Sequence, residues 1–158
     1  MSKITIYSQS TVKTTLVAYG MTKLITRGLY LLDANYVAVS DKDASDYFFK
    51  LSKQAASALV GYEETFRDCD KFSRLVQSLG IVTHAISWKQ MNVPQTAGLG
   101  LGVFNYQPDS GNGLHSINFL LTKKESDSSL HIRFFEPQTG NELFLTITEK
   151  NSVDLVLL

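Results

Sequence analysis

The chain contains one cysteine, Cys69, in a sequence context that could make its thiol reactive. Asp68 precedes a helical apolar pattern and is predicted to be an N-cap, which places Cys69 in the first turn of a helix. Unpaired backbone N–H groups and the positive end of the helix dipole favour a thiolate at such a position. Cys69 also belongs to the apolar stripe of this helix, so an inert, packed thiol is the alternative.

A histidine and a carboxylate could complete a site around this thiol. His115 opens a predicted strand after a glycine-rich turn, and Glu136 ends a predicted strand of aromatic residues. In a Cys–His–carboxylate set, the histidine takes the thiol proton and the carboxylate orients the imidazole. If the two strands form an antiparallel hairpin, turn symmetry places His115 opposite Glu136, and a register shifted by two residues is also compatible. His84 and His131 are the competing histidines, each inside a predicted strand.

Four segments containing these residues resemble the C-terminal domain of mushroom agglutinins and its phage-borne relatives. That domain is a papain-like cysteine peptidase fold with a Cys, His, Glu triad in this chain order. The resemblance implies Cys69 as nucleophile, His115 as general base and Glu136 as the orienting group. The four segments are Asp68–Phe72, Gly100–Val103, His115–Asn118 and Phe135–Gly140.

The same resemblance implies further site residues and a cofactor. Calcium dependence in the agglutinins suggests a metal near the cysteine, with Asp68 and Asp70 as the local carboxylates. An oxyanion hole would use the backbone N–H of Cys69 and a side-chain donor. Gln138 and Asn118 are the expected oxyanion or site-supporting residues, because no glutamine lies shortly before the cysteine.

The predicted elements give an α+β fold. Apolar residues at three- and four-residue spacing predict helices over 10–25, 43–59 and 69–79, the last ended by Gly80. Loops are expected at 88–97 and 107–113. Extended segments are expected over 28–39 (interrupted by a turn), 81–87, 99–106, 115–122, 130–135, 142–148 and 153–158.

This order predicts a papain-like α+β architecture, with a helical N-terminal half packed on an antiparallel β-meander. We expect residues 1–158 to form a single domain, with a mainly helical lobe over 1–80 and a mainly β lobe over 81–158.

Composition excludes several functional classes. The 158 residues carry 15 Lys+Arg and 15 Asp+Glu, and the pI is near 6.8, which disfavours a nucleic-acid partner. The pair Lys123-Lys124 with Arg133 could form only a small basic patch, and the pair itself is typical of a solvated turn. One cysteine excludes an intramolecular disulfide and a Cys-rich zinc site. Apolar runs are shorter than the about 20 residues that cross a bilayer, and no signal-peptide core is apparent, so we expect a cytoplasmic protein without a membrane partner.

Two functions agree with these features. The first is a thiol hydrolase, specifically a cysteine peptidase, that acts on a peptide or protein substrate through Cys69, His115 and Glu136. The alternative is a non-catalytic binding or structural module of a phage or other mobile element that retains the papain-like fold. The sequence alone leaves open whether the chain is an enzyme.

Overall fold

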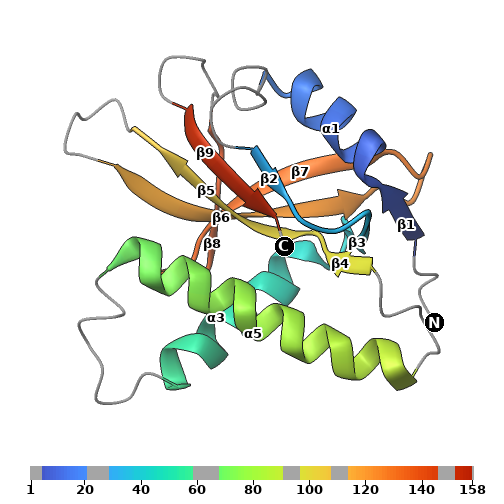
Figure 1. Cartoon of the computed structure of the whole chain (residues 1–158). Coiled ribbons are helices and arrows are strands. Elements are labelled where there is room, and N and C mark those ends of the chain that lie inside the picture. The colour runs from blue at the N-terminus through green and yellow to red at the C-terminus, as the bar shows by residue number, and fades with distance from the viewer. Residues whose placement is uncertain are drawn as a thin grey trace.

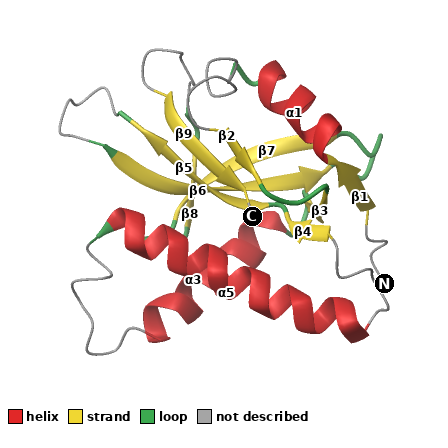
Figure 2. Cartoon of the chain, in the orientation of Figure 1, coloured by secondary structure: helices red, strands yellow, loops and turns green. Residues whose placement is uncertain are grey.

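A mixed β-sheet separates one helix from two others in the computed structural model, which describes residues 5–20, 29–58, 68–90, 97–107, 114–145 and 152–157. Helix α1 (Gln9–Ala18) covers one face of the sheet, whereas α3 (Ala44–Ala58) and α5 (Cys69–Gln90) cover the other (Figure 1). Figure 2 shows the same three layers by secondary structure. The fold is α+β, as predicted.

The described strands form one sheet that both halves of the chain supply. Along the main path their order is β1-β3-β6-β5-β9-β2, while β7 pairs with β6, β8 with β7, and β4 with β3. Their bounds are Thr5–Ser8 (β1), Leu29–Leu31 (β2), Asn35–Ser40 (β3), Ala97–Leu99 (β4), Leu101–Tyr106 (β5), His115–Lys123 (β6), Leu130–Glu136 (β7), Asn141–Leu143 (β8) and Ser152–Leu157 (β9).

The predicted antiparallel meander is only part of this sheet. The pairs β5–β6, β6–β7 and β7–β8 are antiparallel, as a meander requires. However, β3 pairs in parallel with both β4 and β6, and β2 pairs in parallel with β9. A meander was predicted because neighbouring strands in the sequence were assumed to pair. The sheet instead also joins strands that are far apart in the chain.

Gly100 allows β6 to change its neighbour from β5 to β3. Its N–H donates to the carbonyl of Val37 in β3 at 2.8 Å, and its carbonyl accepts from the N–H of Leu121 in β6 at 2.7 Å. A Cβ atom at this position would lie 2.6 Å from the Cβ of Leu121 and 2.7 Å from the Val37 carbonyl oxygen. Only glycine fits between the two backbones, which explains this glycine in the Gly-Leu-Gly run.

Side-chain alternation along β6 divides the core into two clusters. Ile117 and Phe119 pack toward α1, where Val12 and Leu16 are buried. Leu120 points to the opposite face and belongs to the cluster that includes residues of α3 and α5. Each face of the sheet is thus covered by apolar helix residues, and the strand ends remain available for polar groups.

The prediction that α5 ends at Gly80 is wrong, as is the strand predicted over 81–87. The helix continues to Gln90. A Cβ atom on Gly80 would lie 2.6 Å from Cδ2 of Leu101 and 3.1 Å from Cδ2 of Leu51. The glycine therefore permits close packing of α5 against β5 and α3 and does not terminate the helix.

The remaining predictions differ mainly at element ends. Helix α1 begins one residue earlier than the predicted helix over 10–25, with Ser8 as N-cap, and ends at Ala18, while 21–25 lie outside the described residues. Helix α3 agrees closely with the predicted helix. Strand β1 was not predicted. Of the predicted loops, 88–90 is helical, and 91–96 and 108–113 lie outside the described residues, as does 146–148 of the predicted strand over 142–148. No helix in the described ranges is long and apolar enough to cross a membrane.

Candidate functional site

The cysteine lies at the start of α5, and Asp68 caps this helix as predicted. The N–H of Lys71 donates to Oδ1 of Asp68 at 3.1 Å, and the N–H of Phe72 donates to the Asp68 carbonyl at 2.9 Å. These bonds satisfy backbone donors that a helix start otherwise leaves unpaired. Cys69 is a free cysteine, and the residue is partly buried.

His115 and Glu136 meet at the end of the sheet where β6 begins and β7 ends. Nε2 of His115 lies 2.6 Å from Oε2 of Glu136, and the two side chains are 27% and 14% exposed. The second carboxylate oxygen, Oε1, accepts the backbone N–H of Gln138 at 3.4 Å. The carboxylate is therefore held by its own turn while it orients the imidazole.

The strand register differs by two residues from the one that places His115 directly opposite Glu136. Asn118 pairs with Phe135. In this register the next residue of β7, Glu136, faces Ile117 and not His115. This is the shifted register that the sequence left open. His115 and Glu136 still touch because they are diagonal neighbours on the same side of the sheet, within reach of long side chains.

The surroundings of His115 favour its charged form. Its pKa is raised from 6.5 to about 9, chiefly by the hydrogen bond to Glu136. Burial opposes this shift, while a hydrogen bond with Cys69 and the charges of Glu136 and Cys69 add to it. The thiol therefore lies close enough to the imidazole to favour its charged form. Because Nε2 is engaged by Glu136, Nδ1 is the ring nitrogen left for the thiol.

The turn after Glu136 packs closely against helix α3. The N–H of Gly140 donates to the Glu136 carbonyl at 2.8 Å, and Gly140 has a φ of 78°, which favours glycine. A Cβ atom there would lie 2.6 Å from Oγ of Ser52 in α3. The Glu-Pro-Gln-Thr-Gly run therefore forms a tight turn that leaves no room for a side chain at its last residue.

The two expected supporting residues, Gln138 and Asn118, lie in different parts of the structure. Gln138 is half-buried in the turn beside Glu136. Asn118 is fully buried, and its amide donates to the carbonyls of Ser73 and Gly102, both at 3.0 Å. With both donors used, Asn118 cannot also donate to an oxyanion, and a site-supporting role for it stays a prediction.

Tyr106 is a site neighbour that sequence reasoning missed. It pairs with His115 in the β5–β6 ladder, and its ring meets the imidazole edge-on with a centroid separation of 5.8 Å. Its pKa is raised, first by burial and then by the charge of Glu136. The only sequence signal was an aromatic residue at the end of a predicted strand.

Of the competing histidines, His131 is engaged elsewhere. Its Nδ1 lies 3.0 Å from the hydroxyl of Tyr19, and its Nε2 lies 2.9 Å from Oγ of Ser129. These partners belong to α1 and to the β6–β7 turn, away from Cys69. The side chain of His84 is outside the described part of the chain.

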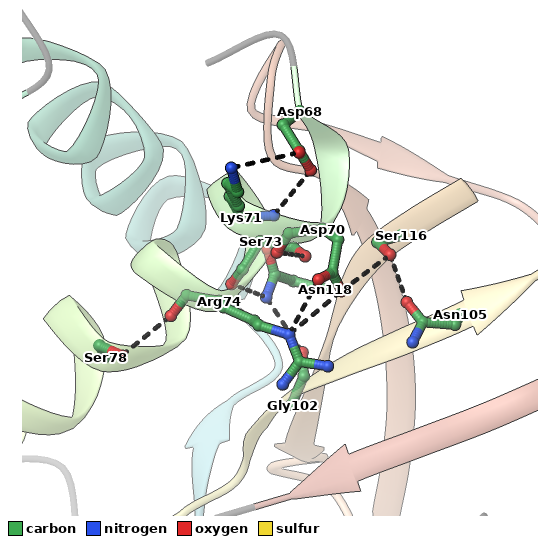
Figure 3. A network of polar contacts seen from close by, with 10 residues as sticks. All are labelled: Asp68, Asp70, Lys71, Ser73, Arg74, Ser78, Gly102, Asn105, Ser116 and Asn118. Carbon is green, nitrogen blue, oxygen red and sulfur yellow. Dashed lines mark hydrogen bonds and ion pairs between the residues drawn. The ribbon is translucent and has the colours of Figure 1, made fainter. Parts of the chain in front are cut away.

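Asp68 and Asp70 do not form a fitting calcium site with the other described residues. Asp68 is engaged as the helix cap, and Asp70 accepts from Nε of Arg74 at 3.1 and 3.2 Å and from Oγ of Ser116 at 3.4 Å (Figure 3). Calcium requires six or more oxygen ligands. Across the described ranges, no group of three or more His, Cys, Asp or Glu could hold a metal ion. Calcium binding stays a prediction.

Comparison with solved structures identifies similar chains, among them the following two. One, from the PSL1a-E64 complex, has a TM-score of 0.61 at 18% identity, over 96% of this chain and 51% of that chain. The other, Polyporus squamosus lectin bound to the human-type influenza-binding epitope Neu5Aca2-6Galb1-4GlcNAc, has a TM-score of 0.55 at 21% identity, over 87% and 45%. This chain has a lectin-like fold. It spans about half the length of the chains it matches.

The other comparisons add no relative: no protein-family profile matches the chain, and no curated protein does. The classification as a hydrolase of the cysteine-peptidase class is contradicted. The protein class named among the matching structures is a lectin, and neither structure is named as a peptidase. At such low identity the likeness shows the fold alone, and the specifically papain-like description is not established by it.

Proposed function

We propose that this chain is a binding module with a thiol-containing ligand site formed by Cys69, His115 and Glu136. The observation that carries the proposal is the 2.6 Å hydrogen bond between His115 and Glu136 beside the partly buried Cys69, whose thiol contributes to the raised pKa of His115. The arrangement of a helix start against two strand ends supports a papain-like organisation as part of this proposal. Cytoplasmic placement and an origin in a phage or mobile element stay predictions.

The ligands we expect are molecules with an electrophilic carbon. An imidazolium next to a thiolate stabilises it, and a thiolate is the reactive form of cysteine. With an epoxide, the sulfur of Cys69 would form a C–S bond as the epoxide C–O bond breaks. The resulting alkoxide would take the proton of the His115 imidazolium. The epoxide E64 is the probe of choice, because one of the matching structures is a complex with it.

The test is the rate at which E64 labels the folded chain at neutral pH, followed by intact mass. We expect a single adduct on Cys69 that forms faster than the adduct of N-acetylcysteine. The adduct should be absent in Cys69→Ala and slower by about tenfold or more in His115→Ala, because the thiolate would lose its neighbouring imidazolium. His131→Ala is the matched control, because this imidazole also has two hydrogen-bonding partners but lies away from the thiol.

Two results would contradict the proposal. Labelling of wild type no faster than that of N-acetylcysteine would mean that the neighbours of Cys69 do not activate it. Release of fragments from denatured casein by wild type, but not by Cys69→Ala, would exclude a role limited to binding.

A carbohydrate is the second candidate ligand, favoured by the oligosaccharide bound to the matching lectin. In the described part of this chain, an open cavity of about 400 Å³ is lined by residues that include Tyr19, Arg133, Glu142 and Phe144. Exposed aromatic rings and charged groups of this kind can contact sugar rings and hydroxyls. NMR titration with Neu5Aca2-6Galb1-4GlcNAc tests this candidate. Resonance shifts at these residues would support it, and unchanged spectra would exclude this sugar.

A further inference from the structure

Helix α5 turns a polar stripe toward the sheet below the proposed thiol site. Cys69, Ser73 and Gln77 are spaced four residues apart and therefore lie on one face of the helix. Ser73 is 0% exposed and Gln77 is 2% exposed, although both are polar. Buried polar groups are costly unless they are hydrogen-bonded. Oγ of Ser73 donates to the Asp70 carbonyl of the same helix at 3.0 Å, whereas Gln77 donates to the Leu101 carbonyl of β5 at 3.1 Å.

Asn118 of β6 hydrogen-bonds to the backbone of α5 near Cys69. Its Nδ2 donates to the carbonyl of Ser73, one helical turn after Cys69, and to the carbonyl of Gly102 in β5 (Figure 3). Both bonds are 3.0 Å long, and Asn118 is 0% exposed. One side chain therefore ties the beginning of α5 to β5 and to β6, the strand that begins with His115.

The amide of Asn118 has only one orientation that suits these partners. Its Oδ1 is buried and has no hydrogen-bond partner, whereas a rotated amide would point this oxygen at the two carbonyl oxygens. An unsatisfied buried acceptor destabilises the fold, and the neighbouring core residue on the same side of β6 is an ordinary leucine, Leu120. The amide therefore joins α5 to the sheet through two donors and leaves one acceptor unpaired.

A second side-chain hydrogen bond between the start of α5 and β6 is weaker. Oγ of Ser116 donates to Oδ1 of Asp70 at 3.4 Å, near the limit for a hydrogen bond. The Asp70 side chain is 47% exposed and is shared with Arg74, and Ser116 also contacts Asn105. Water can replace such a contact, so it constrains the helix less than the buried amide does.

We propose that Asn118 is a positioning residue that holds the first turn of α5 on the sheet, so that Cys69 stays within hydrogen-bonding reach of His115. This inference rests on the proposed function, because it assigns Asn118 a role at that thiol site. The residue acts through the helix and does not touch the ligand.

The test compares Asn118→Leu with Gln77→Leu in the full chain. Gln77 is a buried amide on the same helix stripe that donates to the Leu101 carbonyl at 3.1 Å, one turn farther from Cys69. Two quantities are measured on the folded proteins: the rate of E64 labelling, and the pH midpoint of the His115 imidazole by NMR. Both variants should unfold at lower urea concentration than wild type, so stability alone does not separate them.

We expect Asn118→Leu to slow labelling by about tenfold, equivalent to one pKa unit. We also expect it to lower the His115 midpoint toward that of Cys69→Ala. Gln77→Leu should leave both quantities at their wild-type values. If Asn118→Leu does not fold, Asn118→Thr replaces it, because threonine keeps one donor and suits a strand. It should change both quantities in the same direction by a smaller amount.

The NMR measurement separates failure of this inference from failure of the proposed function. If wild type is labelled no faster than N-acetylcysteine, the proposed function fails, yet the His115 midpoint still reports whether the thiol contact depends on Asn118. A folded Asn118 variant with the wild-type midpoint would overturn the positioning role. An equal decrease in Gln77→Leu would overturn it as well, because the effect would then belong to the whole helix interface.

Discussion

Nε2 of His115 lies 2.6 Å from Oε2 of Glu136, although the two residues are not partners in the β6–β7 ladder. They are joined diagonally, across a step at which Cβ atoms in antiparallel sheets are about 7–8 Å apart. A glutamate and an imidazole are long enough to span this step. The contact is partly buried, so salt screens it less than it screens an exposed ion pair.

The His115–Glu136 pair should make the free energy of unfolding decrease as the pH rises into the alkaline range. The pKa of His115 is raised from 6.5 to about 9, so the folded state holds the proton more tightly than the unfolded state. The stabilisation is complete below about 6.5 and is lost as the pH rises through about 9. The difference in free energy of unfolding between wild type and Glu136→Gln, from urea titrations, should therefore shrink over this interval. A difference that does not vary with pH would contradict this coupling.

Replacing the orienting carboxylate should slow the alkylation of the Cys69 thiol. In Glu136→Gln the main cause of the raised His115 pKa is removed, so less imidazolium is present at neutral pH. We expect alkylation of Cys69 by iodoacetamide to slow by about tenfold, the equivalent of one pKa unit. Glu142→Gln is the control, because this carboxylate lies on the next strand and pairs with Arg133. Equal slowing in both variants would argue against a specific role for Glu136.

Replacing Gly100 by alanine should destabilise the fold more than replacing Gly80 by alanine. Gly100→Ala places a Cβ against the Val37 backbone oxygen, which cannot move aside, and should cost about 3 kcal/mol. Gly80→Ala meets the ends of leucine side chains and gains helix propensity, so its net cost should be about 1 kcal/mol. Ser78→Ala on the exposed side of α5 should change stability by less than about 0.5 kcal/mol. Urea unfolding measures all three, and a reversed order would contradict the packing described for Gly100.

The ion pair of Arg133 and Glu142 should contribute more than exposed pairs do. Nε and Nη2 of Arg133 donate to the two carboxylate oxygens at 2.7 Å, and both side chains are about one-fifth exposed. A double-mutant cycle with Arg133→Met and Glu142→Leu should give a coupling of about 1 kcal/mol or more. The exposed pair Lys50–Asp46 should give about 0.5 kcal/mol or less. Equal coupling in both cycles would refute the difference.

Local signals allowed the site to be assembled from sequence. Asp68 marked the beginning of α5 because capping depends on a few adjacent residues, and the observed hydrogen bond agrees. His115 and Glu136 were placed at strand ends by hairpin symmetry, which brought them together even though the register differs by two residues. Period-two patterns tolerate such a shift, because a shift by an even number of residues keeps the same face.

Features that depend on distant contacts could not be predicted. Gly80 resembles a helix end in sequence, and only its contacts with Leu101 and Leu51 explain why the helix continues. The parallel pairing of β2 with β9 joins residues near the two ends of the chain, and nothing local indicates it. The hydrogen bonds of Asn118 were equally hidden, because its partners are backbone carbonyls that carry no sequence signature.

The continuity of α5 through Gly80 also limits how the chain can be divided. A cut after Leu79 would separate Cys69 from the second half of its own helix, at the point where α5 packs most closely against β5. Neither fragment would keep a complete version of that interface. Two fragments divided there could regain the thiol site only by reassembling with each other, so the midpoint of the sequence is an unsuitable place for circular permutation or for inserting a reporter domain.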